Sequence, residues 1–161
     1  MGPQWYDKSI IILGCGNVLF GDDGFGPAVA QCLQRNFTVP VDICVLDVGT
    51  SVREILFDIV LSDRKPAKIV IVDAMDCGRE PGELFAPDID SIPRIKLDSF
   101  SLHQVPTSNL LRELRDLCGI EVVMIACQVS RTSEEVSMGL SNPVEVAVER
   151  AAKMLAREHF R

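Results

Sequence analysis

Four short runs rich in β-branched and aliphatic residues constrain the fold of this chain more than any other feature. They are residues 9–14, 41–47, 67–73 and 121–127. Strands that are apolar along most of their length occur in sheets that are buried on both faces, and such sheets are usually parallel. A membrane span needs about 20 apolar residues, so none of these runs predicts one. They predict the strands of a buried, mostly parallel sheet in a protein without a membrane partner.

Segments with helical periodicity separate and follow these runs. The helical segments are residues 27–37, 52–61, 107–117 and the stretch from residue 142 onward. We expect Thr107 or Ser108 to cap the third helix, and Asn142 to cap the last one, with Pro143 at its first helical position. The alternation predicts the α/β class, as a three-layer α/β/α sandwich with a twisted sheet of about five strands and helices on both faces. A short edge strand is expected near residues 83–86.

Length and composition narrow the kind of protein. The 161 residues are predicted to form a single domain, 1–161, because no linker or low-complexity segment interrupts them. The net charge is −7 and no cluster of Lys and Arg could follow a phosphate backbone, so we expect no nucleic-acid partner. The six cysteines contain no C-x-x-C pair and no signal-peptide pattern precedes the first strand, which predicts reduced core cysteines in a cytoplasmic protein.

A nucleotide site is the first hypothesis for the loop that follows the first strand. Gly14-x-Gly16 is similar to the start of a dinucleotide fingerprint, but Leu19 stands where the third glycine would be needed. No P-loop string occurs anywhere in the chain. The glycines of this loop, including Gly16 and Gly26, permit a close approach of the backbone to another group or a tight strand-to-helix turn.

A carboxylate or metal site is the second hypothesis, because ligands of open α/β sheets bind at the carboxyl ends of the strands. Asp22 and Asp23 follow the first strand, Asp73 ends the third, and His103 follows a long connection. Two carboxylates and an imidazole suit a divalent transition metal. Structural alternatives are an N-cap for Asp22 or Asp23, a solvated strand end for Asp73 and a structural role for His103. With Asp76, the carboxylates would also suit a Mg²⁺-dependent phosphohydrolase.

The motifs and their order resemble a known family. They are G-x-G-N-x-L-x-G-D-D-G-x-G-P at 14–27, D-x-G-T at 47–50, V-D-A at 72–74 and H-Q at 103–104. This pattern resembles the hydrogenase maturation endopeptidases, which remove a C-terminal peptide from the large-subunit precursor of [NiFe] hydrogenases. The resemblance extends from about Ile10 to Leu155. The run that begins at His103 and the Gly-Leu-Ser segment at 139–141 are most similar to the subgroup serving the coenzyme F420-reducing hydrogenase of methanogens.

The resemblance implies which residues engage the metal. It assigns Asp23, Asp73 and His103 to the nickel that has already been inserted into the precursor. The hydrogenase large-subunit precursor is then the partner, and nickel is supplied by this substrate, with zinc or cadmium as surrogates at the same site. A metal-activated hydrolysis stays a hypothesis at this point. The same residues would serve a non-catalytic maturation chaperone that binds the precursor without cutting it.

The resemblance also assigns a role to the loop after the second strand. Asp47 is implicated in activity or substrate handling, and Gly49 and Thr50 form the substrate loop. Val48 replaces the first glycine of the family's D-G-G-T loop. The chain has no G-x-S-x-G nucleophile elbow and no H-E-x-x-H zinc motif. Cys15 could be proposed as a nucleophile, but we expect it to pack in the core.

Overall fold

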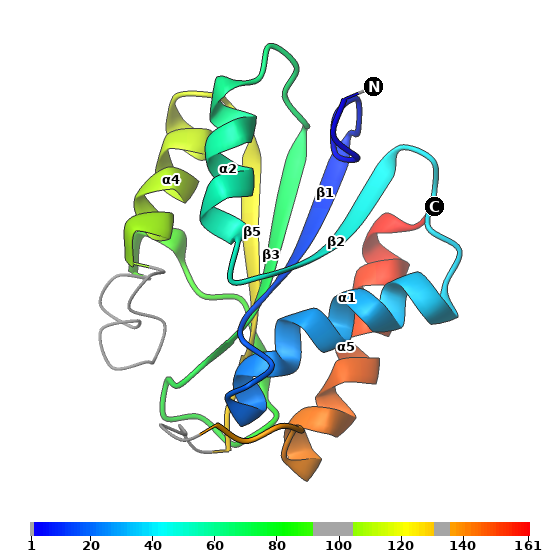
Figure 1. Cartoon of the computed structure of the whole chain (residues 1–161), viewed down its shortest axis with the longest axis vertical. Helices are drawn as coiled ribbons and strands as arrows, with labels where there is room; N and C mark the ends of the chain where they lie inside the picture. The colour runs from blue at the N-terminus through cyan, green and yellow to red at the C-terminus, as the bar shows by residue number, and fades with distance from the viewer. Residues whose placement is uncertain (1, 92–104, 131–135) are drawn as a thin grey trace.

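The computed structural model describes residues 2–91, 105–130 and 136–161 (Figure 1). Its strands are β1 (Ile10–Cys15), β2 (Ile43–Gly49), β3 (Lys68–Met75), β4 (Leu84–Phe85) and β5 (Glu121–Gln128). Its α-helices are α1 (Phe25–Asn36), α2 (Val52–Leu61), α4 (Val105–Asp116) and α5 (Asn142–His159), and its 3-10 helices are η1 (Gly21–Gly24) and η2 (Ile89–Ser91). Each of the four long strands and four helices that the apolar periodicity predicts is present, with bounds that differ by a few residues at most.

The strands form one five-stranded sheet within the described residues, in the order β2-β1-β3-β5-β4. β1, β2, β3 and β5 are parallel, whereas β4 pairs antiparallel with β5 at one edge. The mostly parallel sheet and the short edge strand near residues 83–86 are therefore confirmed. From β1 the chain moves to β2 on one side and then returns to β3 on the other side. The strand order thus reverses between β1 and β3, which is where open α/β sheets bind ligands.

Helices cover both faces of the sheet and make the three predicted layers. Figure 1 shows α1 and α5 on one face and α2 and α4 on the other. Alternation along the strands divides the core accordingly, because Val70 and Val72 pack with α1 and α5, whereas Ile69 and Ile71 pack with α2 and α4. Full burial of each such side chain contributes about 1.5–3 kcal/mol. No helix in the described ranges is long and apolar enough for a membrane span.

Two of the predicted helix starts were wrong by one or two residues. α4 begins at Val105, so Thr107 and Ser108 lie within its first turn and do not precede it. Pro106 permits this earlier start, since proline lacks an N–H and its fixed φ suits the first turn of a helix. The cap of α5 is Ser141 rather than Asn142, with φ −63° and ψ 157°, so Pro143 is the second helical residue instead of the first.

Candidate active site

The carboxyl ends of β1 and β3 bring two of the predicted site residues to the point where the strand order reverses. Asp73 lies near the carboxyl end of β3. Asp23 belongs to η1, which follows β1 in the chain and contacts β3. The sheet topology therefore places these two aspartates on neighbouring elements, although they are 50 positions apart in the chain.

Close packing of α1 against the sheet fixes this arrangement. A Cβ atom at Gly26 would overlap the carbonyl oxygens of Cys15 and Val72, so only glycine lets α1 enter between the ends of β1 and β3. Gly16 has a φ of +139°, and a Cβ there would overlap the carbonyl oxygen of Asp23. These contacts confirm the predicted close approach of the backbone and hold η1 against the end of β1.

The carboxylate of Asp23 is half-buried and folds back onto the loop before it. Its Oδ2 accepts a hydrogen bond of 2.8 Å from the backbone N–H of Asn17. The side-chain oxygen of Asn17 in turn accepts the N–H of Leu19 at 3.0 Å. The loop and the carboxylate therefore support each other at the end of β1.

The neighbouring Asp22 has a different environment. Its side chain is 6% exposed, and its two oxygens accept three hydrogen bonds. Ser141 donates its N–H at 2.7 Å and its hydroxyl at 2.8 Å, and Ser130 donates its N–H at 2.8 Å. The cap position of α1 is Gly24, which has no side-chain capping bond, so the interpretation of Asp22 or Asp23 as the N-cap of this helix was wrong.

Asp73 is the most deeply buried carboxylate of the site. It is 1% exposed, so the alternative of a solvated strand-end carboxylate was wrong. Its Oδ1 accepts the N–H of Ala74 at 2.8 Å. Alternation along β3 places it on the α2 and α4 face of the sheet, together with Ile71 and Met75. A carboxylate costs free energy in such surroundings unless polar partners or a ligand compensate it.

Asp47 lies near the end of β2, on the other face of the sheet. Its register partner in β1 is Gly14, and its Oδ2 accepts a hydrogen bond of 3.1 Å from the side chain of Gln31 in α1. Its side chain is therefore exposed on the α1 side, and the sheet separates it from that of Asp73. Gly49, with a φ of +56°, accepts the N–H of Gly16 at 2.9 Å, and this bond holds the predicted substrate loop beside the loop of Asp23.

Thr50 is an exposed turn residue directly after β2. The next residue, Ser51, donates its N–H to the carbonyl oxygen of Val48 at 2.9 Å. This bond closes a tight turn between β2 and α2. The turn geometry that Gly49 and Thr50 predict is therefore retained even though Val48 replaces a glycine.

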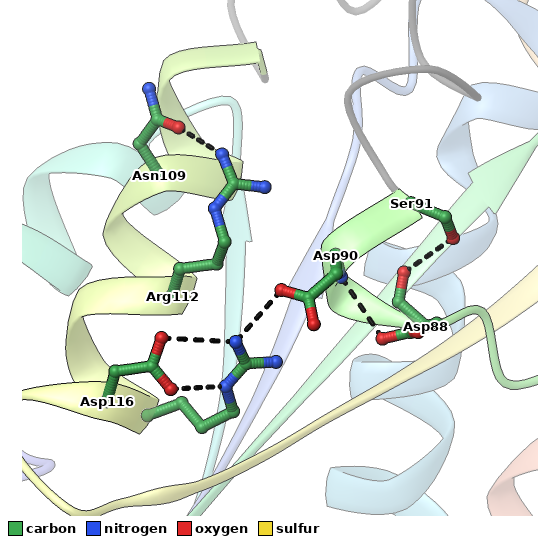
Figure 2. Close-up of polar contacts among 7 residues, drawn as sticks. Asp88, Asp90, Ser91, Asn109, Arg112 and Asp116 are labelled. Atoms are coloured by element: carbon green, nitrogen blue, oxygen red, sulfur yellow. Dashed lines mark hydrogen bonds and ion pairs between the residues drawn. The ribbon is translucent and has the colours of Figure 1, made fainter.

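His103 lies outside the described residues, so its predicted role as a metal ligand stays a prediction. The described chain on either side of its segment is η2 and α4, which contact each other. Arg115 of α4 donates to Asp90 of η2 at 2.9 Å and to its neighbour Asp116 at 2.8 Å (Figure 2). Among residues 2–91, 105–130 and 136–161, no three His, Cys, Asp or Glu side chains are grouped so that they could hold a metal ion.

A residue at the end of β5, which the sequence did not reveal, organises the loop after β3. Gln128 is 3% exposed, and its Oε1 accepts the N–H groups of Cys77 at 2.8 Å and Arg79 at 3.1 Å. Its Nε2 donates to Asp76 at 3.0 Å and to the carbonyl oxygen of Val129 at 3.0 Å. A single glutamine at the end of an apolar strand carries no distinctive pattern, so no sequence signal could have identified it.

Cys15 has the environment of a core residue. It is 1% exposed, and its Sγ donates to the carbonyl oxygen of Leu13 at 3.6 Å. It packs within the cluster on the α2 and α4 face of the sheet. The prediction that Cys15 packs in the core is confirmed.

A pocket and exposed apolar side chains adjoin η1. The pocket has a volume of about 360 Å³, and its lining includes Asp22, Ser130 and Ser141. Ser137 pairs with the loop before η1 by donating its N–H to Leu19 at 2.7 Å and accepting the N–H of Gly21 at 2.6 Å. The exposed apolar residues of these two segments are Val18, Leu19, Val136 and Met138. The site is thus bordered by a surface with both polar and apolar character.

Comparisons with known proteins agree on one family. Residues 27–158 match the family model for hydrogenase maturation proteases, a range that includes Asp47, Asp73 and His103 and begins just after Asp23. A protein of Methanocaldococcus jannaschii, assigned as a hydrogenase maturation protease, is 42% identical over 152 residues, which cover 94% of this chain and 96% of that protein. The coenzyme F420 hydrogenase subunit delta of Methanothermobacter thermautotrophicus is 36% identical and covers 95% of this chain and 96% of its own length.

A solved structure agrees with these sequence relatives. The hydrogenase maturating endopeptidase HybD of Escherichia coli superposes with a TM-score of 0.74 at 26% identity, over 92% of each chain. The order of strands and helices described above is therefore the arrangement that this kind of endopeptidase uses.

Proposed function

Because this chain belongs to the hydrogenase maturation protease family, we propose that it removes the C-terminal peptide of a nickel-loaded [NiFe] hydrogenase large-subunit precursor. Membership of the family makes the chain a peptidase that processes a hydrogenase precursor. The observation that supports nickel recognition is the position of Asp23 and Asp73 on contacting elements, where the strand order reverses. Two carboxylates at such a point can engage a metal that a partner presents.

Nickel is part of the substrate in this proposal. Asp23 and Asp73 supply carboxylate oxygens and His103 supplies an imidazole nitrogen, and nickel accepts this mixed donor set. Because the ligands belong to the protease and the nickel to the precursor, cleavage follows only after nickel insertion. Zinc or cadmium could occupy the same donors in the purified protein.

The other residues of the site would handle the polypeptide around the scissile bond. Asp47 is exposed beside α1 and Gly49 is held next to Gly16, so the substrate loop borders the loop that carries Asp23. The apolar side chains near η1, such as Leu19 and Met138, offer contacts to a polypeptide. The relative from M. thermautotrophicus supports a coenzyme F420-reducing hydrogenase as the source of the precursor.

Two observations disfavour a Mg²⁺-dependent phosphohydrolase. That function would need the oxygens of Asp22 and Asp76 for the cation, but Asp22 accepts hydrogen bonds on both of its oxygens. Asp76 accepts bonds from Gly78 at 3.3 Å and from Gln128 at 3.0 Å. A chaperone that binds without cutting would use the same ligands as the protease, so the experiment below includes that outcome.

The test is incubation of the protein with a nickel-loaded precursor and with a nickel-free precursor, followed by mass spectrometry of the precursor. We expect loss of a C-terminal peptide from the nickel-loaded form alone. His103→Ala should abolish processing, whereas His159→Ala is the matched control because His159 lies at the end of α5. Loss of a hydrogen-bond partner of a metal ligand lowers activity by about 10- to 100-fold. Asp23→Asn and Asp73→Asn change the ligands themselves, so each should lower the processing activity by more than this.

Each alternative result has a clear meaning. Retained binding without any mass loss would identify a chaperone. Equal cleavage of both precursors would remove nickel as the recognition element. An unchanged cleavage rate in His103→Ala would defeat the assignment of that residue.

A further inference from the structure

Asp22 is a buried carboxylate that the proposed nickel site does not use. It sits one residue before Asp23 in η1, and its side chain is 6% exposed. Its three donors belong to two distant segments, because Ser130 follows β5 and Ser141 precedes α5. One side chain thus joins η1 to the segments at both ends of the connection between β5 and α5.

The geometry of these bonds fixes the position of η1. Oδ1 accepts the N–H of Ser141 at 2.7 Å, while Oδ2 accepts the hydroxyl of Ser141 and the N–H of Ser130, both at 2.8 Å. A carboxylate that accepts bonds on both oxygens can neither rotate nor shift without breaking one of them. Hydrogen bonds to a charged group are also stronger than neutral ones, so η1 is attached firmly.

Asp23 depends on η1 for its own position. Its carbonyl oxygen is packed against Gly16, and its Oδ2 accepts the N–H of Asn17 at 2.8 Å. These contacts hold Asp23 on the side of β1, whereas the bonds of Asp22 hold the same turn on the side of β5 and α5. The turn is therefore held from both sides, by the contacts of Asp23 on one side and by those of Asp22 on the other.

We infer that Asp22 is a positioning residue, which holds the carboxylate of Asp23 where it meets the metal of the substrate. This inference rests on the proposed role of Asp23 in nickel recognition. Groups that orient a metal ligand commonly contribute about 10- to 100-fold to metal affinity or activity, although they do not touch the metal. The bonds to Ser130 and Ser141 make Asp22 such a group for η1.

The test compares Asp22→Asn with Asp23→Asn by the kcat/KM of processing of nickel-loaded precursor and by amide hydrogen exchange. An asparagine at position 22 has one oxygen instead of two and presents an NH₂ group to N–H and O–H donors. We expect its kcat/KM to fall about 10- to 100-fold. The amide of Asn17, which reports the position of Asp23, should exchange at least about 10-fold faster, while amides of α2 change less.

Two further variants separate positioning from general stability. Ile59→Val is a mild truncation in the core beneath α2 and should leave both kcat/KM and Asn17 exchange near wild type. Ser141→Ala removes only the hydroxyl bond to Asp22 and should lower kcat/KM by about 5-fold. If Asp22→Asn does not fold, Ser141→Ala still tests whether the bonds of Asp22 position Asp23.

The possible outcomes distinguish this inference from the proposed function. If Asp22→Asn and Ser141→Ala both process the precursor at the wild-type rate, or if Asn17 exchange does not change, Asp22 has no positioning role. A loss that Ile59→Val reproduces would also overturn the inference. A wild-type rate in Asp23→Asn would instead overturn the proposed nickel contact, whatever the exchange at Asn17 shows.

Discussion

Three aspartates at the same edge of the sheet have three different environments. Asp22 is buried and accepts three hydrogen bonds, Asp23 is half-buried beside Asn17, and Asp73 is 1% exposed at the end of β3. An unpaired charge in an apolar interior costs several kcal/mol, so its environment decides what a carboxylate can do. At the residue scale, burial and hydrogen-bond donors make Asp22 a carboxylate that fixes the backbone, whereas Asp23 and Asp73 are the carboxylates that we propose for the metal.

Cys127 provides a test at the same scale. Burial, and then the negative charge of Asp22, raise the pKa of its thiol to about 12, while Arg150 acts in the opposite direction. Because the thiolate is the reactive form, Cys127 should resist alkylation at pH 8 in the folded protein. We expect mass spectrometry after treatment with iodoacetamide to find Cys127 unmodified and the half-buried Cys118 modified. Equally fast modification of both thiols would contradict this expectation.

At the scale of elements, an ion pair joins the two parts of the described chain that flank residue 103. Arg115 of α4 contacts Asp90 in η2 and Asp116 in its own helix (Figure 2). The hydrogen bond from Arg115 lowers the pKa of the Asp116 carboxyl below its ordinary value of 3.8. The guanidinium thus has two acidic partners, one on each element, and the contact between η2 and α4 depends partly on charge.

The lowered pKa of Asp116 gives its ion pair with Arg115 inside α4 a predictable pH dependence. A carboxyl whose folded-state pKa is depressed adds stability at pH values above its unfolded-state pKa, and this stability is lost as the pH falls through the folded-state value. The urea midpoint of wild type should therefore exceed that of Asp116→Asn at pH 7, and the difference should shrink below about pH 4. Midpoints from circular dichroism at several pH values test this. A difference that grows at low pH would contradict the expected sign.

At the scale of the whole molecule, one sheet supports two cores. Leu33 belongs to the core beneath α1 and α5, and Leu56 belongs to the core beneath α2 and α4, and both are 0% exposed. Trp5, the single tryptophan, packs in the core with Leu56. Because the same strands contribute side chains to both cores, we expect the two cores to unfold together, as the predicted single domain 1–161 requires.

Two core truncations test this coupling. Leu33→Ala and Leu56→Ala should each lower the free energy of unfolding by about 2–5 kcal/mol. Trp5 fluorescence reports only the α2 and α4 core. In Leu33→Ala, however, the unfolding transition measured by this fluorescence should coincide with the transition measured by far-UV circular dichroism. Leu61→Ala is the surface control, at 71% exposure, and should change stability by less than about 0.5 kcal/mol. Separate transitions for fluorescence and circular dichroism would show two independent units.

Local sequence patterns were sufficient to predict the elements of the fold and the segments that carry the site. Local apolar periodicity is a property of a few consecutive residues, so strands such as β1 and helices such as α2 could be predicted closely. The motifs also identified Asp23 and Asp73 as candidates, because both follow or end a predicted strand. His103 lies outside the described residues and stays a prediction.

The environment of each side chain at that edge depends on tertiary contacts. Asp22 receives its donors from residues 108 and 119 positions away, and Gln128 bonds to Cys77 over 51 positions, so no local pattern could reveal either network. The order of the strands and the face that each side chain takes separated Asp47 from Asp73. Hydrogen-bond partners and burial depend on which distant segments meet, and chain folding alone brings those segments together.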